Sequence, residues 1–428
     1  LSHREALVLL DCELPDLNEE MFSLAKQIKE RFYGRRIVMF APLYLSNYCV
    51  NGCIYCPYHG KNTHILRKKL TQEEIRREVI ALQDMGHKRL ALEAGEHPAQ
   101  NTMDYYLESI DTIYSIHHQN GAIRRVNINI AATTVENYRK LKEAGIGTYI
   151  LFQETYHKDA YQILHPTGPK SNYSYHTEAM DRAMDGGVDD VGIGVLFGLD
   201  HYRYDFVGLL MHAEHLEAAK GVGPHTISVP RIRPADDIDV QDFENAVADE
   251  IFMKIVAIIR LAVPYTGMIV STRESAKVRT RVLDLGISQI SGGSRTMGRV
   301  YGWLLICNPP QQSLTQLADV LSVSKAAVST VARQLQEAGM VERLPSPNRQ
   351  HLYRVIPGGF TSVMGTQLSR MRLGIEAAEF GLSVLGADRA EQRQRVEDFR
   401  DFCEFCTHTY RDEFMRMWTD YRTRRRQP

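Results

Sequence analysis

Three cysteines stand within eight residues of one another, in the stretch "NYCVNGCIYCPYH". They are Cys49, Cys53 and Cys56, and the whole chain of 428 residues contains only seven cysteines. Four arrangements would bring three thiols so close: core residues, a redox pair with a spare thiol, a zinc site that lacks one ligand, or a cluster site with one position open. A structural zinc site takes four protein ligands, and no fourth Cys or His stands at zinc-ribbon spacing. Three thiolates on a loop, in contrast, hold three irons of a [4Fe-4S] cube and leave the fourth iron open.

The composition is ordinary for a soluble globular protein: 44% of the residues are apolar, 24% are charged, and the formal net charge is -1. This charge gives no overall reason to expect a nucleic-acid partner, so a DNA-binding face has to be local. No apolar run reaches the roughly 18 residues of a membrane span, and no secretory signal opens the chain. Clustered cysteines indicate metal or redox chemistry in a reducing compartment. We therefore expect a cytoplasmic protein without a membrane partner.

The elements that must position the cysteines alternate between strands and helices from residue 36 to residue 296. Short apolar runs such as "RIVMFAPLYL" and "RLALEAGE" are separated by amphipathic stretches such as "TQEEIRREVIALQDMG", many of which end in glycine as helices do. Eight such alternations predict an α/β fold, a (β/α)8 barrel of the TIM type, with a doubly wound open sheet as the alternative. In a barrel, chemistry gathers where strands end and loops begin. Polar residues expected at those points are Glu96, Glu154, Arg231, Arg273, Ser294 and Arg295.

The character of the chain changes near "SGGSRTMGRVYGWLLICNPPQQ", and we place a domain boundary between residues 296 and 297. A barrel of this kind needs a last helix after its eighth strand, and no obvious one follows Thr296, although the helical stretch "MGRVYGWLLIC" would cover that face only by accident. Residues 297–360 contain two helical patterns joined by a tight turn and then a basic hairpin, which predicts an α+β winged helix-turn-helix domain. Residues 361–428 form a charged helical region.

The spacing C-x3-C-x2-C after a first barrel strand resembles the signature of the radical S-adenosylmethionine (radical SAM) superfamily. The resemblance implies a [4Fe-4S] cluster on Cys49, Cys53 and Cys56, whose open iron chelates S-adenosylmethionine. One-electron cleavage of that cofactor then gives a 5'-deoxyadenosyl radical that abstracts hydrogen from a substrate, so an electron donor of the flavodoxin or ferredoxin type is implied. The positions that correspond to the family's cofactor contacts are Tyr55, Gly95, Glu96, Glu154 and Arg182. For Arg182, a solvated helix residue is the alternative.

A narrower resemblance joins the segments "APLYLSNYCVNGCIYCPYH", "LFQETYH", "GPHTISVPRIRPA", "VSTRES" and "ISQISGGSRT". Together they resemble the tyrosine lyase of [FeFe]-hydrogenase maturation and, less closely, the tyrosine lyase of thiazole synthesis. The resemblance covers residues 1–296 and implies that free L-tyrosine is split at its Cα–Cβ bond into p-cresol and dehydroglycine. Recognition of free tyrosine needs a cation for the carboxylate and acceptors for the amine and the phenol. Residues near the ends of the last two strands that supply such groups are Arg273, Gln289, Ser291, Ser294 and Arg295.

The resemblance also bears on a second iron site. His225 resembles the residue with which the maturase holds an extra iron of a second cluster, although a single histidine beside a strand is more often structural. The maturase's segment for that second cluster, a C-x2-C pair with a later cysteine, does not follow "GGSRT" here. Cys403 and Cys406 form a C-x2-C pair, but they lie on a helical pattern and we interpret them as helix residues. Conversion of dehydroglycine to CO and cyanide is therefore not predicted.

The stretch "SLTQLADVLSVSKAAVSTVARQLQEAGMVERL" is similar to winged-helix transcriptional regulators of the MarR type, especially the branch of the glycine-betaine regulators. In a helix-turn-helix, the second helix enters the major groove with its N-terminal residues towards the bases. Residues expected on that face are Ser324, Lys325, Ser329, Thr330 and Arg333, and the expected wing contacts are Arg343, Asn348, Arg349 and His351. The resemblance implies duplex DNA as a partner and a homodimer through residues 361–421. A helical pair that packs on the barrel is the structural alternative.

Two unrelated halves thus stand in one chain. A natural fusion, a gene-model artefact and an engineered hybrid each explain the join, and we favour an artificial or spliced join. The motifs of the first half are more numerous and more particular, so the sequence predicts a radical SAM carbon–carbon lyase of the tyrosine type. The alternative is a winged-helix transcriptional regulator in which the barrel is a sensor or a passenger.

Overall fold

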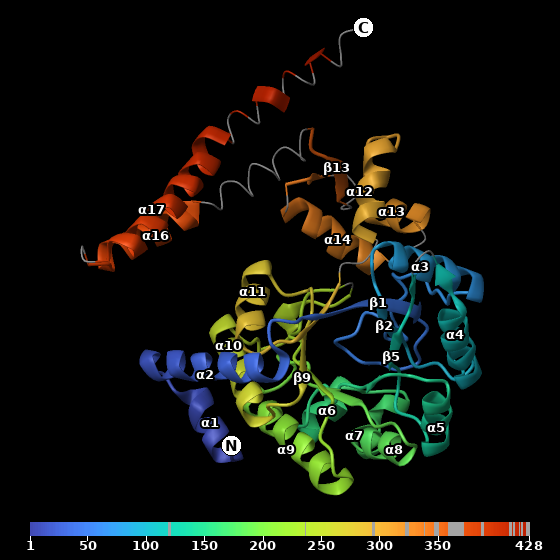
Figure 1. Ribbon diagram of the computed structural model, residues 1–428. Coiled ribbons are helices and arrows are strands. Elements are labelled where there is room, and N and C mark those ends of the chain that lie inside the picture. The colour runs from blue at the N-terminus through green and yellow to red at the C-terminus, as the bar shows by residue number, and fades with distance from the viewer. Residues whose placement is uncertain are drawn as a thin grey trace. The chain divides into compact units, whose positions relative to one another are not determined.

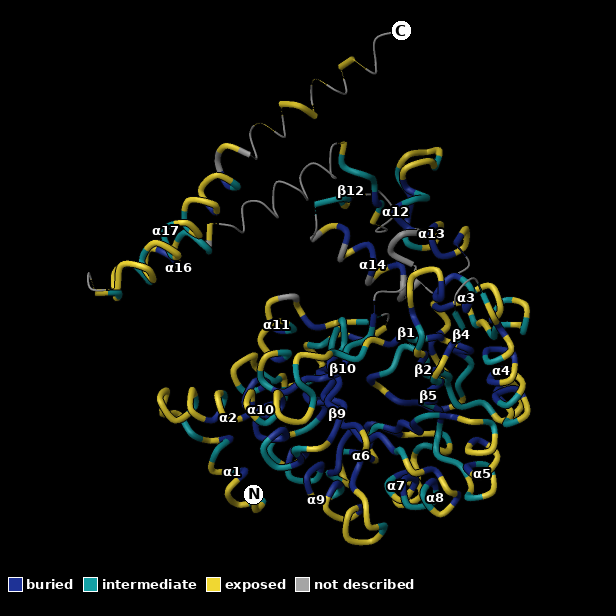
Figure 2. The backbone as a smooth tube through the Cα atoms, in the orientation of Figure 1, coloured by how far each residue is buried: buried dark blue, intermediate teal, exposed yellow. Residues whose placement is uncertain are grey.

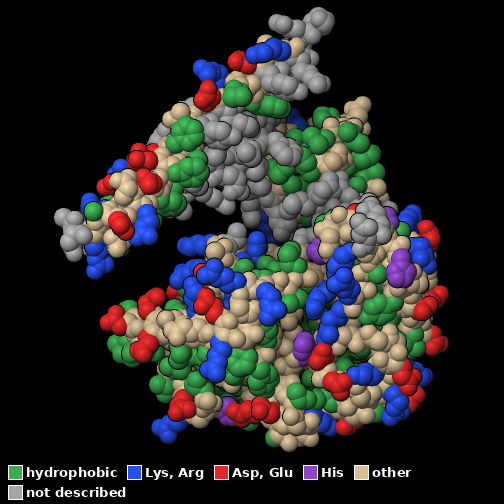
Figure 3. Space-filling view, in the orientation of Figure 1, with side chains coloured by type: hydrophobic (Ala, Val, Ile, Leu, Met, Phe, Trp, Pro, Cys, Tyr) green, Lys and Arg blue, Asp and Glu red, His purple; other side chains and the backbone are tan. Residues whose placement is uncertain are grey.

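The protein is described from a computed structural model. The described residues are 1–118, 121–235, 237–292, 296–321, 325–337, 339–345, 351–357, 372–386, 389–410, 413, 416–418, 420 and 423–424. The chain folds into two compact units, Leu1–Arg295 and Thr296–Pro428 (Figure 1). Among the described residues, no helix combines the length and the apolar character that a bilayer crossing requires. Acidic and basic side chains both occur across the visible face, in keeping with the near-zero net charge (Figure 3).

Eight parallel strands close into a barrel in the first unit (Figure 1). They are β1 (Val38–Ser46), β2 (Arg89–Ala94), β5 (Arg125–Asn129), β6 (Tyr149–Ile150), β7 (Val191–Gly194), β8 (Thr226–Ser228), β9 (Gly267–Val270) and β10 (Gln289–Ser291). Their order around the barrel is β1-β10-β9-β8-β7-β6-β5-β2. The eight strands match the eight strand–helix alternations that the sequence predicts. The closed sheet confirms the α/β barrel and rules out the open doubly wound sheet.

Helices between the strands cover the outside of the barrel, and Figure 2 shows the strands as a mostly buried layer inside them. In chain order the helices are α3 (Gln72–Asp84), α4 (Met103–Ser115), α5 (Val135–Glu143), α6 (Lys158–Leu164), α7 (Tyr173–Thr177), α8 (Ala179–Asp185), α9 (Tyr202–Lys220), α10 (Asp249–Ala262) and α11 (Ala276–Leu285). Short 3-10 helices lie at η1 (Pro169–Ser171) and η2 (Val240–Asp242), and a small hairpin joins β3 (His117–His118) to β4 (Gly121–Ala122). Threonine caps such as Thr71 and Thr102 accept a backbone N–H and fix where α3 and α4 begin.

Two N-terminal helices, α1 (His3–Asp11) and α2 (Pro15–Tyr33), precede the barrel, and both pack on α10. At the amino ends of β9 and β10, the fully buried Arg260 of α10 supplies a polar tie. Its guanidinium donates to the carbonyl oxygens of Pro264 (2.7 Å), Thr266 (2.9 Å) and Gly286 (2.7 and 3.2 Å). Because β9 begins just after Thr266 and β10 follows Gly286, Arg260 holds the starts of both strands.

The second unit contains a winged helix. Its helices are α12 (Thr296–Ile306), α13 (Leu314–Leu321) and α14 (Lys325–Glu337), and its strands β11 (Gln311–Ser313), β12 (Val341–Leu344) and β13 (Leu352–Val355) form an antiparallel sheet in the order β11-β13-β12. The helical stretch that follows the eighth strand forms α12, which belongs to this second unit. Val300 and Leu304 of α12 are buried in the core of the winged helix together with Leu317 and Val331.

A helical pair follows the winged helix. It consists of α16 (Arg372–Val384) and α17 (Ala390–Glu404), which pack on each other, and of the π-helix η3 (Phe405–Tyr410) that continues α17. Cys403 is buried and Cys406 is partly exposed, and both lie in this continuous helical segment. The interpretation of the C-x2-C pair as helix residues is confirmed.

Candidate functional site

The three cysteines lie on a loop of mostly irregular structure that follows β1, at the carboxyl end of the barrel strands. Cys53 is buried, whereas Cys49 and Cys56 are partly exposed. Three backbone N–H groups of the loop donate to neighbouring carbonyl oxygens: Val50 to Glu96 (2.8 Å), Gly52 to Thr167 (3.0 Å) and Ile54 to Leu164 (3.1 Å). The cysteine loop is therefore held against the segments that follow β2 and α6.

Arg67 closes the cysteine loop from its far end. Its Nη1 donates to the carbonyl oxygens of Asn47 (2.6 Å) and Tyr58 (2.8 Å). Its Nη2 donates to those of His59 (2.7 Å) and Asn62 (3.0 Å). One planar guanidinium thus joins the chain before the first cysteine to the chain after the last one, a geometry that a lysine ammonium does not reproduce.

Replacing Arg67 with lysine is expected to loosen the cysteine loop while keeping the charge. Loss of two or more charge-assisted hydrogen bonds lowers the free energy of opening the loop by about 2 kcal/mol, so a chelator should remove bound iron roughly 30-fold faster. Time-resolved iron release to a ferrous chelator under anaerobic conditions measures this. Arg260→Lys is the matched control, because Arg260 also makes four such bonds but at the other end of the barrel. Equal iron release from Arg67→Lys and wild-type protein would contradict the role assigned to Arg67.

Gly95, directly after β2, lets the cysteine loop approach the barrel closely. A Cβ atom at this position would lie 2.5 Å from the carbonyl oxygen of Tyr48 and 2.9 Å from the Cβ of Cys49. The backbone N–H of Gly95 donates to the carbonyl oxygen of Ser46 (3.1 Å). Any side chain here would have to displace the first cysteine.

Two carboxylates predicted at strand ends lie beside the cysteine loop. Asn51 Nδ2 donates to Glu96 Oε2 (2.7 Å) and lies 3.7 Å from Cys49 Sγ. The backbone N–H of Lys170 donates to Asn51 Oδ1 (3.0 Å), and Lys170 Nζ lies 2.7 Å from Glu154 Oε1. Burial raises the pKa of Glu96, whereas Glu154 raises the pKa of Lys170 against the effect of burial. Glu154 has a φ of 70°, so this ion pair sits on a backbone conformation that non-glycine residues rarely adopt.

Tyr55 belongs to an apolar wall beside the cysteines. The wall consists of Cys53, Tyr55, Leu164, Leu196, Leu199 and Ile232. The hydroxyl of Tyr55 lies 2.7 Å from Nε2 of His165, whose Nδ1 lies 2.7 Å from the carbonyl oxygen of Tyr161. Burial and the charge of Lys170 lower the pKa of His165 to about 3, so the imidazole is neutral. Nδ1 then carries the proton, and Nε2 accepts the hydroxyl hydrogen of Tyr55.

Arg182 of α8 has a different set of partners. Its Nε donates to the carbonyl oxygen of Thr133 (3.1 Å), its Nη2 donates to that of Tyr175, and its guanidinium lies 3.9 Å from the centre of the Tyr175 ring. Glu178 is an ion-pair partner at 3.8 Å. Among the described residues, these contacts do not include the cysteine loop, and the role of Arg182 towards the cofactor stays a prediction.

The residues predicted to bind the substrate lie at different positions along the barrel strands. Arg273 follows β9 at the carboxyl end, and Ser291 ends β10 with its Oγ accepting from the backbone N–H of Thr272 (3.4 Å). Gln289 is the first residue of β10 and pairs with Val38 of β1 and Ile269 of β9, and its role towards the substrate stays a prediction. The other two predicted residues, Ser294 and Arg295, lie outside the described residues.

His225 stands just before β8, at the amino end of the barrel strands. Its Nδ1 lies 3.3 Å from Asp190 Oδ1, and Asp190 also accepts a hydrogen bond from Arg125. Burial lowers the pKa of His225. An iron held by His225 would be separate from the cysteine loop, as a second site requires, and that role stays a prediction.

Sequence reasoning missed several residues around the loop, notably Arg67, Lys170 and Glu93. Glu93 lies two positions before Gly95 in "RLALEAGE", on the same side of β2. A charged residue in an otherwise apolar strand, two positions before Gly95, was a sequence feature that could have pointed to Glu93. Arg67 and Lys170 carried no such signal, because each stands in an irregular segment whose partners are remote in sequence.

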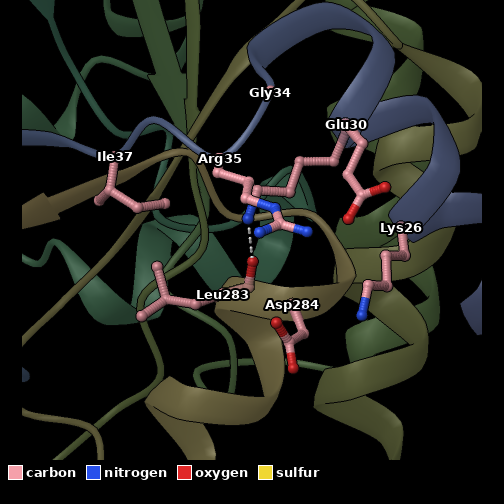
Figure 4. A pocket seen from close by; sticks show the side chains of 8 residues that line it. Lys26, Glu30, Gly34, Arg35, Ile37, Leu283 and Asp284 are labelled. Carbon is pink, nitrogen blue, oxygen red and sulfur yellow. Dashed lines mark hydrogen bonds between the residues drawn. The ribbon is translucent and has the colours of Figure 1, made fainter.

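A separate pocket of about 380 Å3 lies near the amino end of β1, between α2 and α11 (Figure 4). Its lining residues are Lys26, Lys29, Glu30, Gly34, Arg35, Ile37, Leu283 and Asp284. Lys29 Nζ donates to the carbonyl oxygen of Leu283. The pocket is at the opposite end of β1 from the cysteine loop.

The helix-turn-helix residues are only partly described. Ser329 and Arg333 are exposed one turn apart on α14, and Lys325 and Thr330 belong to the same helix. Arg343 and His351 share a hydrogen bond across the base of the β12–β13 hairpin. Ser324, Asn348 and Arg349 lie outside the described residues.

Comparison with protein families finds three matching models. The radical SAM superfamily matches residues 43–238, the biotin and thiamin synthesis associated domain matches residues 228–341, and the MmpR5-like MarR family of transcriptional regulators matches residues 358–422. The second match crosses the boundary after Arg295 into the winged-helix unit.

Individual relatives divide between the two units. The 2-iminoacetate synthase of Salmonella typhimurium is 31% identical over 301 residues, which cover 69% of this chain and 76% of that protein. The crystal structure of HydG, a maturase of the [FeFe]-hydrogenase, is 61% identical with a TM-score of 0.68, over 69% of this chain and 65% of that one. The chain thus spans just under two thirds of that HydG structure.

The regulator MmpR5 of Mycobacterium tuberculosis is 32% identical over 120 residues, which cover 28% of this chain and 73% of that protein. The presence of both kinds of match in one chain supports a fusion architecture. The chain belongs to the radical SAM superfamily, among relatives of 2-iminoacetate synthase and HydG, and carries a MarR-type winged-helix domain after its barrel.

Proposed function

We propose that the barrel unit is a radical SAM carbon–carbon lyase that splits L-tyrosine at its Cα–Cβ bond. The observation that carries this proposal is the cysteine loop, with three thiols within eight residues held at the carboxyl end of the barrel. The tyrosine side chain leaves as p-cresol, and the remaining two-carbon imine is dehydroglycine, also called 2-iminoacetate. The name of the Salmonella relative states that imine as the product, which supports this choice of reaction.

The residues of the cysteine loop fit the cofactors that this family uses, a [4Fe-4S] cluster and S-adenosylmethionine. In the described part of the chain, no three His, Cys, Asp or Glu side chains converge on a single metal ion. A cube takes one thiolate at each of three irons, so its ligands need not converge on one point. Burial raises the pKa of Cys53 to about 11 and that of Cys56 to about 12, so iron binding must release their protons. When bound, the two cofactors supply one-electron cleavage of a sulfonium and abstraction of a hydrogen atom.

The residues around the cysteine loop are proposed to hold the cofactor and to exclude water. The positive charge of Lys170 acts on both Cys53 and Cys56 and favours their thiolate forms. Glu96 and Glu154 present carboxylate oxygens that accept from an amino group, beside the close approach that Gly95 permits. Tyr55 and its apolar neighbours keep water from one side of the thiols.

Anaerobic reconstitution with iron and sulfide tests the proposal. Roughly four irons per chain are expected. Addition of S-adenosylmethionine, L-tyrosine and a reduced flavodoxin or ferredoxin is expected to give p-cresol, measured by chromatography. Cleavage of S-adenosylmethionine without p-cresol, by protein that carries a full cluster, would reject tyrosine as the substrate.

We also propose that residues 297–360 bind duplex DNA. The exposed positions of Ser329 and Arg333 on the second helix of the helix-turn-helix support this role. Exposed apolar side chains on the helical pair, among them Phe380, Val384 and Phe402, support a homodimer through residues 361–421. Sedimentation velocity of the intact chain measures its oligomeric state, and a monomer at micromolar concentration would contradict that interface.

Replacing Arg333 with alanine is expected to weaken DNA binding by about 5- to 150-fold, because a base or phosphate contact of an arginine contributes about 1–3 kcal/mol. Fluorescence anisotropy with duplexes selected by the protein measures the change, at two salt concentrations. Arg77→Ala removes the same charge from an exposed position on α3 of the barrel unit and serves as the control. Equal losses from both substitutions would indicate only a general charge effect.

A further inference from the structure

A tight turn with a strained backbone presents Glu154 beside the cysteine loop. The backbone N–H of Thr155 donates to the carbonyl oxygen of Gln153 (3.0 Å), which closes a three-residue turn around Glu154. With a φ of 70° at its centre, this is a γ-turn of the rare kind that strains a residue with a side chain. Such a conformation persists only where the surrounding structure holds it, so the contacts on both sides of Glu154 identify what does so.

The chain that enters the turn is held as an extension of the barrel sheet. The backbone N–H of Gln153 donates to the carbonyl oxygen of Gly194, the last residue of β7 (2.9 Å). The carbonyl oxygen of Glu154 accepts from the backbone N–H of Leu196 (3.1 Å), and Gln153 Nε2 donates to Thr177 Oγ1 (2.9 Å). These bonds fix where the turn begins, but the residues after Glu154 must be held by other contacts.

One face of α9 receives the two residues that leave the turn. Asp205 Oδ1 accepts from both Thr155 Oγ1 and the backbone N–H of Tyr156, each at 2.8 Å. A Cβ atom on Gly208 would lie 2.5 Å from the ring of Tyr156, whose hydroxyl lies 2.8 Å from Nδ1 of His212. Positions 205, 208 and 212 share one side of the helix, at the spacing i, i+3, i+7. This face of α9 therefore fits the exit of the turn closely.

Asp205 is a charged group in a place where packing alone favours a neutral one. The residue is fully buried, and among the described residues its Oδ2 has no hydrogen-bond partner. Burial raises the pKa of Asp205 to about 7, because the ionised form is poorly solvated there. An amide oxygen also accepts two hydrogen bonds, but bonds to a carboxylate are roughly twice as strong. The charge thus tightens the hold on Thr155 and Tyr156, although it does not favour the fold.

We propose that Asp205 is a positioning residue, which holds the turn so that the carboxylate of Glu154 meets Lys170 beside the cysteine loop. Glu154 Oε1 lies 2.7 Å from Lys170 Nζ, and the side chain of Glu154 is only 11% exposed. If Glu154 returned to an ordinary φ, its Cα–Cβ bond would leave the chain in another direction and this ion pair would be lost. The inference deepens the cofactor role proposed for Glu154 and rests on it, since a displaced carboxylate no longer reaches an amino group beside the thiols.

Amide hydrogen exchange of the full chain, measured by mass spectrometry, tests whether Asp205 holds the turn. Asp205→Asn is expected to make the peptide of residues 151–157 exchange roughly 10-fold faster, because two charge-assisted bonds become neutral ones. Thr155→Val keeps the shape of the side chain but removes one donor, and exchange should rise roughly threefold. Ser109→Ala is the matched control, because it removes a fully buried hydroxyl that donates to the carbonyl oxygen of Tyr105 (2.7 Å) in α4. It should leave exchange of the 151–157 peptide unchanged.

Binding of S-adenosylmethionine to the anaerobically reconstituted protein tests whether Asp205 acts through Glu154. Titration calorimetry is expected to show roughly 10-fold weaker binding for Asp205→Asn. In a Glu154→Ala protein, the same change is expected to weaken binding less than about twofold further, because the carboxylate that Asp205 positions is already gone. Equal factors in both backgrounds would indicate a general effect on the fold and would overturn the positioning of Glu154.

The outcomes separate this inference from the proposed function. If wild-type protein with a full cluster binds no S-adenosylmethionine, or binds it and forms no p-cresol, the lyase function is rejected and the exchange measurement still decides the role of Asp205. If p-cresol forms while Asp205→Asn and Thr155→Val both exchange at the wild-type rate, the positioning role is overturned and the lyase stands. Should Asp205→Asn fail to fold by circular dichroism, Thr155→Val decides both measurements against Ser109→Ala.

Discussion

Replacing Cys53 with alanine is expected to abolish both cluster assembly and every turnover that depends on S-adenosylmethionine. Cys53 is the most buried of the three thiols, at 5% exposure, and it stands between the other two on the cysteine loop. A cube left with two protein ligands loses one of its three holding points, and the electron path to the sulfonium is lost with it. Iron content should fall from roughly four per chain towards the level of unreconstituted protein, and p-cresol should become undetectable.

Cys307→Ala is the control that distinguishes loss of a cluster ligand from a general effect of removing a cysteine on folding. Cys307 follows α12 in the second unit and packs against the core of the winged helix, so its loss serves as the control for removing a cysteine elsewhere in the chain. Removing the sulfur of Cys53 itself costs the barrel about 1 kcal/mol of packing, which should leave it folded by circular dichroism. A folded Cys53→Ala protein that still assembles a full cluster would overturn the ligand assignment.

The barrel was predictable because its signal is distributed over the whole unit. Each of the eight strands lies in a short, mostly apolar run, and most of the helices between them carry a side-chain cap or a terminal glycine, so local errors do not change the topology. The end of the barrel was not predictable in this way. The amphipathic pattern of α12 predicts that one face of the helix is buried, but not which part of the protein buries it. In the structure, Val300 and Leu304 are buried in the core of the winged helix.

The residues of the candidate site also divide into those that the sequence reveals and those that it does not. Cys49, Cys53 and Cys56 were evident because their spacing along the chain is the feature that the chemistry needs. Depth in the barrel was less evident, since a three-residue strand such as β10 has its two ends only about 7 Å apart, at the usual rise per residue. The sequence alone therefore does not decide at which depth Gln289 lies. Arg67 was missed because its function is to bind backbone carbonyl oxygens, and carbonyl oxygens have no sequence signature.

Replacing Gly95 with alanine is expected to reduce turnover by about 100-fold while most of the fold remains. The new Cβ atom would lie 2.5 Å from the carbonyl oxygen of Tyr48 and 2.9 Å from the Cβ of Cys49. To reach ordinary contact distance, the start of the cysteine loop must move by roughly 1 Å, and a misplacement of that size costs about 10²-fold in rate. Initial rates of p-cresol formation, normalised to cluster content, measure the effect.

Gly302→Ala gives the matched control, because a Cβ atom on Gly302 of α12 meets nothing within 4 Å. That substitution should leave turnover unchanged and stabilise the helix by up to about 1 kcal/mol, since alanine is the better helix former. If Gly95→Ala kept wild-type turnover, the cysteine loop would have to yield without displacing Cys49. The close approach at the end of β2 would then be a matter of packing alone. A loss confined to Gly95→Ala instead ties the absence of a side chain there to the position of the first thiol.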